Sequence, residues 1–471
     1  MRNLKWTVAL SFSLAAAFLA GCGGSSMTTP PITAQSGTVF VNGTDAPVLV
    51  KNVVAFQVDV TGMTVSDGVN PPQSILNGTQ TIDFARLNGL RTLVDINTIP
   101  AGTYISVQMT LANPVIRYLN IPTPPARPSI TQLDATTTPP AQLTTSSVNV
   151  PLSTPLVVSS GNIIGVLFDF RLDKSILVDG TGQITGQVTP TIKIKTITPS
   201  DADAYIDEFI AGVVNPNASS NSFVIQGPHG HQFTVNVNSQ TEWENNESQA
   251  NLTTNSVVQI SGTLDRLTGT ILADTVAILS QDNFYADGLI TFVDPATGAA
   301  NDFDFYDRGT LPANTMFAPG QITTINLTGN ENFFIYWWHT RMASFLFNSS
   351  LMVPGQHVSL GGKINGSGAS ETLTLKRVVL RHEGHNGSLV PGFTNAGAGT
   401  FQFNCNGLAG ALFGPSVTVF TGPFTNWSGG LNSINDLGGT TAIPLRVVGI
   451  VLRDPVSGQT VFVARGVEEL Q

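Results

Sequence analysis

The chain has 471 residues and a net charge of −10, and charged residues make up only 11% of it. An acidic chain without clusters of Lys and Arg is unsuited to nucleic acid, because contacts to phosphate depend on such clusters. Hydrophobic residues make up 41% of the sequence, which is enough for large cores. Thr, Ser, Asn, Gly and Val take the place of the missing charges, and this composition favours β-structure with short turns.

The N-terminal residues have the pattern of an export signal. Arg2 and Lys5 precede an apolar run over 8–20, which ends in small residues and Cys22. The apolar run is shorter than the roughly 20 residues that a membrane-spanning helix needs. An ordinary secretory signal would not need a cysteine at the cleavage point, whereas one of the two cysteines of this chain stands there.

The segment Leu19-Ala20-Gly21-Cys22 resembles the lipobox of bacterial lipoproteins. That resemblance implies a signal peptide over 1–21, lipidation of Cys22, and attachment of an exported protein to a membrane through acyl chains. Because Gly23 follows the cysteine, the resemblance favours the outer over the inner membrane. Residues 22–36 are rich in Gly, Ser, Thr and Pro and are expected to form a flexible tether.

Residues 37–197 are expected to form a β-sandwich, because short apolar strands alternate there with turn residues. Residues 122–147 are rich in Pro and Thr and are expected to form a long loop. The strands are expected at 38–41, 53–60, 105–109, 148–150, 163–170 and 187–197.

Part of this region resembles a known type of domain. The motifs that carry the resemblance are Gly37-Thr38-Val39, Thr44-Asp45-Ala46-Pro47, Leu93-Val94-Asp95 and Pro100-Ala101-Gly102-Thr103-Tyr104. Together they resemble a family of uncharacterised domains at the N-terminus of bacterial lipoproteins. The resemblance implies a fold for about 37–197 and no catalytic residues.

After an expected linker at 198–207, one pattern occurs three times: an apolar strand with a central glycine, a turn and a second strand. The glycines are Gly262, Gly362 and Gly449. A glycine inside a strand is typical of a β-bulge or a bend in a barrel. We therefore predict an all-β protein in which tandem small OB-like β-barrels follow the sandwich. The barrels are expected over 208–281, 282–382 and 383–471. They also resemble a second uncharacterised family found in tandem in bacterial exported proteins.

Two pairs of histidines have spacings that a metal ion could use. These are His229 with His231, and His382 with His385. Their Gly and Pro neighbours instead favour loops that face solvent. The second pair also lacks the spacing of the helical His-Glu-x-x-His motif. No metal site and no cofactor is therefore expected.

An acidic strand follows in the second repeat. Asp302 and Asp304 share one face, Phe303 and Phe305 lie on the other, and Asp307 comes next. Carboxylates suit calcium, but the Gly-containing pattern of a calcium loop is missing. We expect an exposed strand face.

The other cysteine, Cys405, has no disulfide partner if Cys22 carries lipid. It alternates with Phe401 and Phe403, so its side chain is expected on their face. No cationic neighbour that would lower the pKa of the thiol is evident. A buried and unreactive thiol is predicted.

The aromatic run over 333–339 is the most unusual local feature. Tyr336, Trp337 and Trp338 are candidate ligand-binding residues, because exposed flat rings stack on sugars and on partner proteins. Burial under a neighbouring domain is the alternative interpretation of the same run.

No catalytic motif is evident in the sequence. The expected function is that of a non-enzymatic, membrane-anchored binding or structural module of the cell envelope, for polysaccharide or an envelope protein. The alternative is an envelope glycan hydrolase, which would need two carboxyl groups about 5–9.5 Å apart in a cleft.

Overall fold

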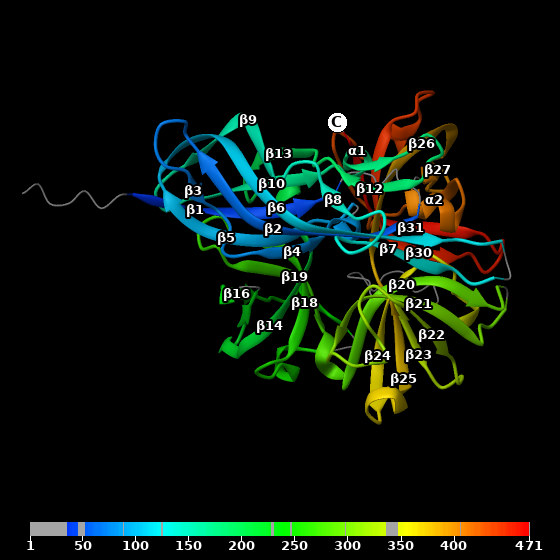
Figure 1. Ribbon diagram of the computed structural model, residues 1–471. Helices are drawn as coiled ribbons and strands as arrows, with labels where there is room; N and C mark the ends of the chain where they lie inside the picture. Colours follow the sequence, from blue (N-terminus) through cyan, green and yellow to red (C-terminus); the bar gives the residue numbers. More distant parts are fainter. Residues whose placement is uncertain are drawn as a thin grey trace, which may run out of the picture. The chain divides into compact units, whose positions relative to one another are not determined.

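The computed structural model describes residues 35–45, 52–87, 89–123, 126–227, 230–244, 247–296, 298–335, 347–405 and 407–470. β-strands dominate this part of the chain, as Figure 1 shows, and the predicted all-β fold is confirmed. The α-helices within the described ranges are α1 (Leu172–Ser175) and α2 (Gly407–Phe413). Short 3₁₀ helices lie at Phe84–Leu87, Ala202–Ala204, Gln249–Asn251, Leu279–Gln281, Ser349–Leu351, Gly368–Ser370 and Ile434–Leu437.

The N-terminal part forms a sandwich of two sheets, with a small third sheet. The strands are β1 (Ser36–Thr44), β2 (Val53–Ser66), β3 (Gln73–Ser74), β4 (Gln80–Asp83), β5 (Thr92–Pro100), β6 (Gly102–Asn120), β7 (Ser129–Leu133), β8 (Gln142–Leu143), β9 (Ser147–Val158), β10 (Ile163–Phe170), β11 (Ile176–Val178), β12 (Ile184–Val188) and β13 (Ile192–Ile197). One sheet has the order β13-β10-β1-β5, and the other the order β3-β2-β6-β7, with β4 and β9 paired to β2 and β6. The small sheet has the order β11-β12-β8.

Aromatic side chains fill the space between the two large sheets. Phe56 comes from β2, and Phe168 and Phe170 come from β10, on the opposite sheet. The Phe170 ring centroid lies 5.2 Å from that of Phe56 and 4.7 Å from that of Phe84. All four rings are fully buried, so burial of apolar surface holds the sandwich together.

The expected long loop at 122–147 was wrong in part, because strands β7 and β8 lie within it. β7 extends one sheet by pairing with β6, where Leu133 faces Ile116 and Ile130 faces Leu119. Leu133 is buried in the sandwich core. Prolines on both sides of β7 favour a loop in the sequence pattern. The two apolar side chains of this strand nevertheless find partners to pack against in β6.

Three six-stranded sheets follow the sandwich. Barrel 1 contains β14 (Ile206–Ser219), β15 (Ser222–Gln226), β16 (Gln232–Asn236), β17 (Glu242–Trp243), β18 (Val257–Leu264) and β19 (Ile271–Ile278). Barrel 2 contains β20 (Phe284–Asp294), β21 (Asp302–Leu311), β22 (Ile322–Asn326), β23 (Asn332–Ile335), β24 (His357–Asn365) and β25 (Thr372–Leu380). Barrel 3 contains β26 (Glu383–Asn395), β27 (Thr400–Cys405), β28 (Ser416–Phe420), β29 (Asn426–Ser428), β30 (Pro444–Arg453) and β31 (Thr460–Glu469).

The three barrels have the same topology. Their strand orders are β16-β15-β14-β18-β19-β17, β22-β21-β20-β24-β25-β23 and β28-β27-β26-β30-β31-β29. In each, the third, second and first strands form an antiparallel meander, and the first strand also pairs with the fifth. Parallel pairing of β16 with β19, and of β28 with β31, closes the first and third barrels. This arrangement is that of the OB-type barrel, as predicted.

The three repeated glycines lie at β-bulges. The sequence prediction of bulges or bends at these glycines is therefore confirmed. The register between the paired strands shifts next to Gly262, Gly362 and Gly449. At each position a Cβ atom would overlap a backbone carbonyl oxygen of the paired strand. Only glycine lets the two backbones approach this closely.

The barrels share their cores with their neighbours. Phe40 and Leu93 of the sandwich belong to the apolar core of barrel 1. Ile450 and Val463 of barrel 3 belong to the core of barrel 2. The described residues from 35 onward accordingly form one compact unit. In these residues no helix has the length and hydropathy needed to span a membrane.

Candidate functional site

Several predicted site residues lie outside the described residues. Cys22, His229, Tyr336, Trp337 and Trp338 belong to this group, so the lipid anchor and the aromatic platform remain predictions.

The aromatic run begins within the described part of the chain, in strand β23. Phe333 packs against Phe347, with 5.5 Å between ring centroids, and joins the core of barrel 2. Phe334 points the other way and is 39% exposed. The expected alternation of faces therefore holds as far as the structure describes the run.

The prediction that His382 and His385 face solvent from a loop was wrong. His382 is buried, and β26 begins directly after it, at Glu383. His385 Nε2 lies 2.8 Å from Glu383 Oε2. The backbone of this strand lies close to the sandwich, because a Cβ atom on Gly89 would come within 2.8 Å of the Gly384 carbonyl carbon. Among the described residues, no three His, Cys, Asp or Glu side chains are grouped to hold a metal ion.

The prediction of an exposed acidic strand was also wrong, because a cation from the sandwich covers it. Arg127 Nη2 lies 2.6 Å from Asp302 Oδ1, and Arg127 Nη1 lies 2.7 Å from Asp304 Oδ1. Asp304 and Asp307 are both buried. Asp307 accepts hydrogen bonds from Gly309 N at 2.9 Å and Thr310 Oγ1 at 2.6 Å.

Asp307 is expected to make stability depend on pH. Burial raises the pKa of this carboxyl group from 3.8 to about 6. The folded state therefore binds this proton more tightly than the unfolded state, and stability falls as the pH rises from about 4 to about 6. Asp307→Asn removes this pH dependence, so between pH 4 and pH 7 its free energy of unfolding is expected to rise by about 3 kcal/mol relative to that of the wild type. Urea unfolding at pH 4 and pH 7 measures the gain; an equal difference at both pH values would contradict it.

Cys405 is buried, as predicted. Burial raises the pKa of its thiol to about 12, so the nucleophilic thiolate is not formed near neutral pH. This residue is a structural part of barrel 3.

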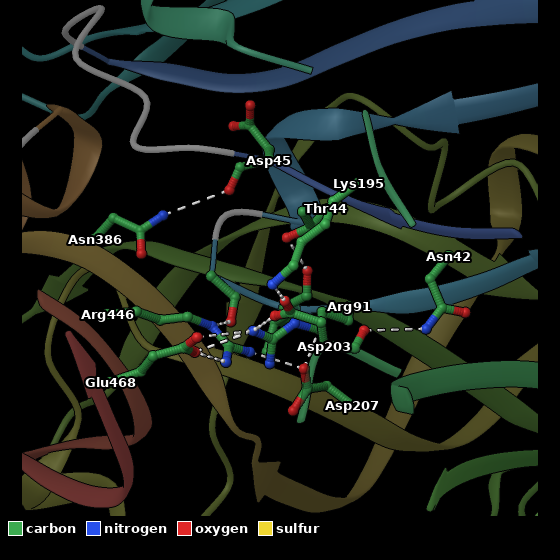
Figure 2. A network of polar contacts seen from close by, with 12 residues as sticks. Asn42, Thr44, Asp45, Arg91, Lys195, Asp203, Asp207, Asn386, Arg446 and Glu468 are labelled. Carbon is green, nitrogen blue, oxygen red and sulfur yellow. Dashed lines mark hydrogen bonds and ion pairs between the residues drawn. The ribbon is translucent and has the colours of Figure 1, made fainter. Parts of the chain in front are cut away.

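A charged junction joins the sandwich to barrel 3, and Figure 2 shows its side chains converging. We use this name for Arg91, Asp203, Asp207, Arg446 and Glu468. Arg91 Nη2 lies 2.6 Å from Asp203 Oδ1 and 3.0 Å from Glu468 Oε2. Arg446 Nη1 lies 3.0 Å from the same Glu468 oxygen, and Arg446 Nη2 lies 2.8 Å from Asp207 Oδ2. The Glu468 carboxylate thus bridges two guanidinium groups.

The junction also gives a role to the expected linker at 198–207, which supplies Asp203 and Asp207. Burial alone would raise the pKa of Asp203, but the Arg91 and Lys195 charges beside it hold that pKa below its usual value. Lys195 Nζ lies 2.7 Å from Asp203 Oδ2 (Figure 2). The segment is therefore a fixed part of the interface between the sandwich and barrel 3.

A second buried group of charges joins the sandwich to barrels 1 and 2. Arg86 forms ion pairs with Glu208 and with Asp287, the latter at 3.0 Å. His357 Nε2 lies 2.8 Å from Asp287 Oδ1, and its Nδ1 lies 2.7 Å from the His382 carbonyl oxygen. Both ring nitrogens of His357 therefore lie within hydrogen-bonding distance of an oxygen atom.

A cavity of about 50 Å³ lies beside this group and is lined in part by Arg86, His357, Glu383 and His385. Its volume suits a few ordered water molecules and is too small for a sugar. The polar groups around it hold one another in place through the contacts described above. Both groups of charges therefore hold neighbouring parts of the fold together.

A groove with a volume of about 410 Å³ lies between the sandwich and barrel 1. We call it the sandwich–barrel groove. One wall comes from β1, β5 and the start of β10, and the other from β16 and the turn between β18 and β19. The lining residues are 36–38, 96–98, 161, 163, 231–234 and 267–270.

The walls of this groove combine hydroxyl, amide and apolar side chains. No Asp, Glu, Lys or Arg is among its lining residues. In the described ranges, the hydroxyl and amide side chains of Thr38, Gln232 and Thr234 have no hydrogen-bond partner. The His231 ring packs on Phe233, with 5.0 Å between centroids. His231, which is expected on a loop that faces solvent, lies directly before β16 and lines this groove.

A comparison with protein families gives a match to the N-terminal part of the chain. Residues 36–186 match a family described as "Domain of unknown function (DUF4382)". This agrees with the resemblance of the N-terminal region to an uncharacterised family. No curated protein sequence matches the chain significantly.

Among solved structures, drosophila Unr CSD456 is similar over 56% of this chain and 97% of that chain. The two share 9% sequence identity, and the TM-score is 0.15. The assignment of the barrel fold therefore rests on the strand pairings described above.

Proposed function

We propose that this protein is a lipid-anchored, non-enzymatic binding protein of the bacterial cell envelope. The sandwich–barrel groove is the observation that carries the proposal, because it is large enough for a small ligand and presents unpaired polar side chains. The lipobox-like segment ending at Cys22 supports the proposed location in the cell envelope, with the outer membrane favoured.

The arrangement of carboxylates supports a binding role rather than hydrolysis. A glycosidase needs two carboxyl groups on either side of its substrate, and none lines the groove. Asp207 and Glu208 do line one cavity, but its volume is about 10 Å³, which is the size of a single water molecule. Both carboxylates are also engaged in ion pairs.

The anchor is tested by replacing the proposed lipidation site. Cys22→Ala is expected to move the protein from the membrane fraction to the soluble fraction, since the acyl chains supply the membrane affinity. Cys405→Ala is the matched control and should stay with the membrane, because that thiol is buried in barrel 3. A Cys22→Ala protein that still sediments with membranes would rule out the lipid anchor.

The binding role is tested by capture from the native envelope. The detergent-solubilised full chain should retain a glycan or a protein from purified envelope. The predicted aromatic platform leads to a separate prediction: the double variant Trp337→Ala with Trp338→Ala should weaken that retention. Unchanged retention would remove the platform from the proposal, and no retention by the wild type would remove the binding role itself.

A further inference from the structure

We propose that the sandwich–barrel groove binds a short, neutral oligosaccharide. This inference rests on the proposed binding function and names the class of ligand. It follows from where the groove lies on barrel 1, from the absence of charge on its walls and from the unpaired groups that line it.

The groove lies at a part of the OB-type barrel that is suited to binding. In such barrels, the face formed by the second and third strands, together with the loop between the fourth and fifth, binds oligonucleotides and oligosaccharides. In barrel 1 the third strand is β16, which contributes Gln232 and Thr234. The two-residue strand β17 is additional to the five strands of an OB-type barrel, so β18 and β19 correspond to the fourth and fifth of these. The turn from β18 to β19 is therefore the corresponding loop, and it contributes residues 267–270.

The charge of the walls decides between these two ligand classes. Binding of single-stranded nucleic acid requires a positively charged groove that follows the phosphates. No Lys or Arg lines this groove, and the whole chain carries a net charge of −10. The same absence of cations disfavours acidic sugars. A neutral oligosaccharide is the class that remains.

The unpaired polar groups match the chemistry of sugar hydroxyls. Thr hydroxyls and a Gln amide both donate and accept hydrogen bonds, as sugar hydroxyls do. Thr38 lies on the sandwich wall, and Gln232 and Thr234 lie on the barrel wall, so a ligand could be held from both sides. Leu267 is 71% exposed and offers an apolar surface for the C–H face of a sugar ring.

The two walls of the groove meet at Gly269, where the backbone conformation favours glycine. Gly269 has a φ of +69°, in the left-handed region that favours glycine. A Cβ atom there would lie 3.3 Å from Ile163 Cδ1 of the sandwich wall. The close approach of the turn to the sandwich is therefore built into the sequence, and it fixes the spacing between the walls.

The test uses the detergent-solubilised full chain and oligosaccharides released from the envelope of the producing cells. Anion exchange separates these into a neutral and an acidic fraction, and each is immobilised beside single-stranded oligothymidine. We expect retention on the neutral fraction. Gln232→Ala with Thr234→Ala should weaken it about tenfold, or about 1.4 kcal/mol.

The sequence offers a matched control for that double variant. Gln108 and Thr110 have the same spacing on an exposed face of β6 and do not line the groove. Gln108→Ala with Thr110→Ala should change retention less than twofold. A further variant, Thr98→Trp, fills the groove from the sandwich wall and should abolish retention even if the barrel variant is poorly folded. Thermal unfolding of each variant checks its folding.

Three results would overturn the inference: no retention on the neutral fraction, retention on the acidic fraction or oligothymidine alone, or unchanged retention when residue 98 is enlarged. Groove-dependent capture of a protein without glycan would also overturn it, yet would leave the proposed binding function standing. Sedimentation of Cys22→Ala with membranes would have the opposite consequence, since it removes the anchor and leaves the groove untouched.

Discussion

Replacing Arg446 with Met is expected to lower the free energy of unfolding by about 3–5 kcal/mol, as breaking buried ion pairs does. Arg446 is 9% exposed, and its Nη atoms contact Glu468 and Asp207 at 3.0 and 2.8 Å. Its Nε donates a hydrogen bond to the Gly89 carbonyl oxygen at 2.6 Å. Met restores neither the charge nor the donors, so three carboxylates of the junction would be left with Arg91 as the remaining guanidinium group.

Urea unfolding at neutral pH measures this loss. Arg453→Met is the matched control, because Arg453 lies on the same strand and its Nη2 donates to one backbone carbonyl, that of Ala296. Its replacement should cost under about 1 kcal/mol, which is typical of a partly exposed hydrogen bond. Equal costs for the two variants would show that the charged junction contributes nothing beyond ordinary surface contacts.

Gly449→Ala is the second large effect we expect, with a cost of about 3 kcal/mol. The added Cβ atom would overlap the Val463 carbonyl oxygen across the bulge and would lie 2.9 Å from a ring carbon of Phe462. Backbone cannot yield as a flexible side chain does, so the pairing of β30 with β31 would have to shift. The core that barrel 3 shares with barrel 2 would be disturbed as well, because Ile450 lies beside the bulge.

Thermal unfolding of Gly449→Ala beside Gly212→Ala tests this expectation. Gly212 also lies inside a strand, β14, but a Cβ atom there would meet nothing within 4 Å. Its replacement should be neutral or should stabilise by up to about 1 kcal/mol, since alanine restricts the unfolded chain. A small effect at both positions would mean that the bulge tolerates a side chain.

The barrel fold could be predicted because its requirements are local in sequence. A glycine inside an apolar strand is needed wherever a bulge brings two backbones together, and Gly262, Gly362 and Gly449 mark such positions. The environment of the polar residues could not be predicted in this way. Alternation shows which side chains share a face, but what covers Asp304 is Arg127, which lies 177 positions earlier.

The groove was missed for a related reason. Its walls come from the sandwich and from barrel 1, and the residues that matter, such as Thr38 and Gln232, are common types without a motif. The turn between β18 and β19 gave the strongest available signal, because an OB-type barrel uses that loop for binding. Following that loop in the sequence would have led to Leu267, an apolar residue in an otherwise polar turn.

The link between Arg91 and Glu468 imposes an order on the assembly of this chain. The two residues are 377 positions apart in the sequence, and synthesis proceeds from the N-terminus at about 5–20 residues per second. Arg91 therefore emerges tens of seconds before its partner exists. Until then Arg91 can pair with Asp203 but not with Glu468, so the contact between the sandwich and barrel 3 forms only after the last strand has been made. The surface of the sandwich that meets barrel 3 therefore stays uncovered during that interval.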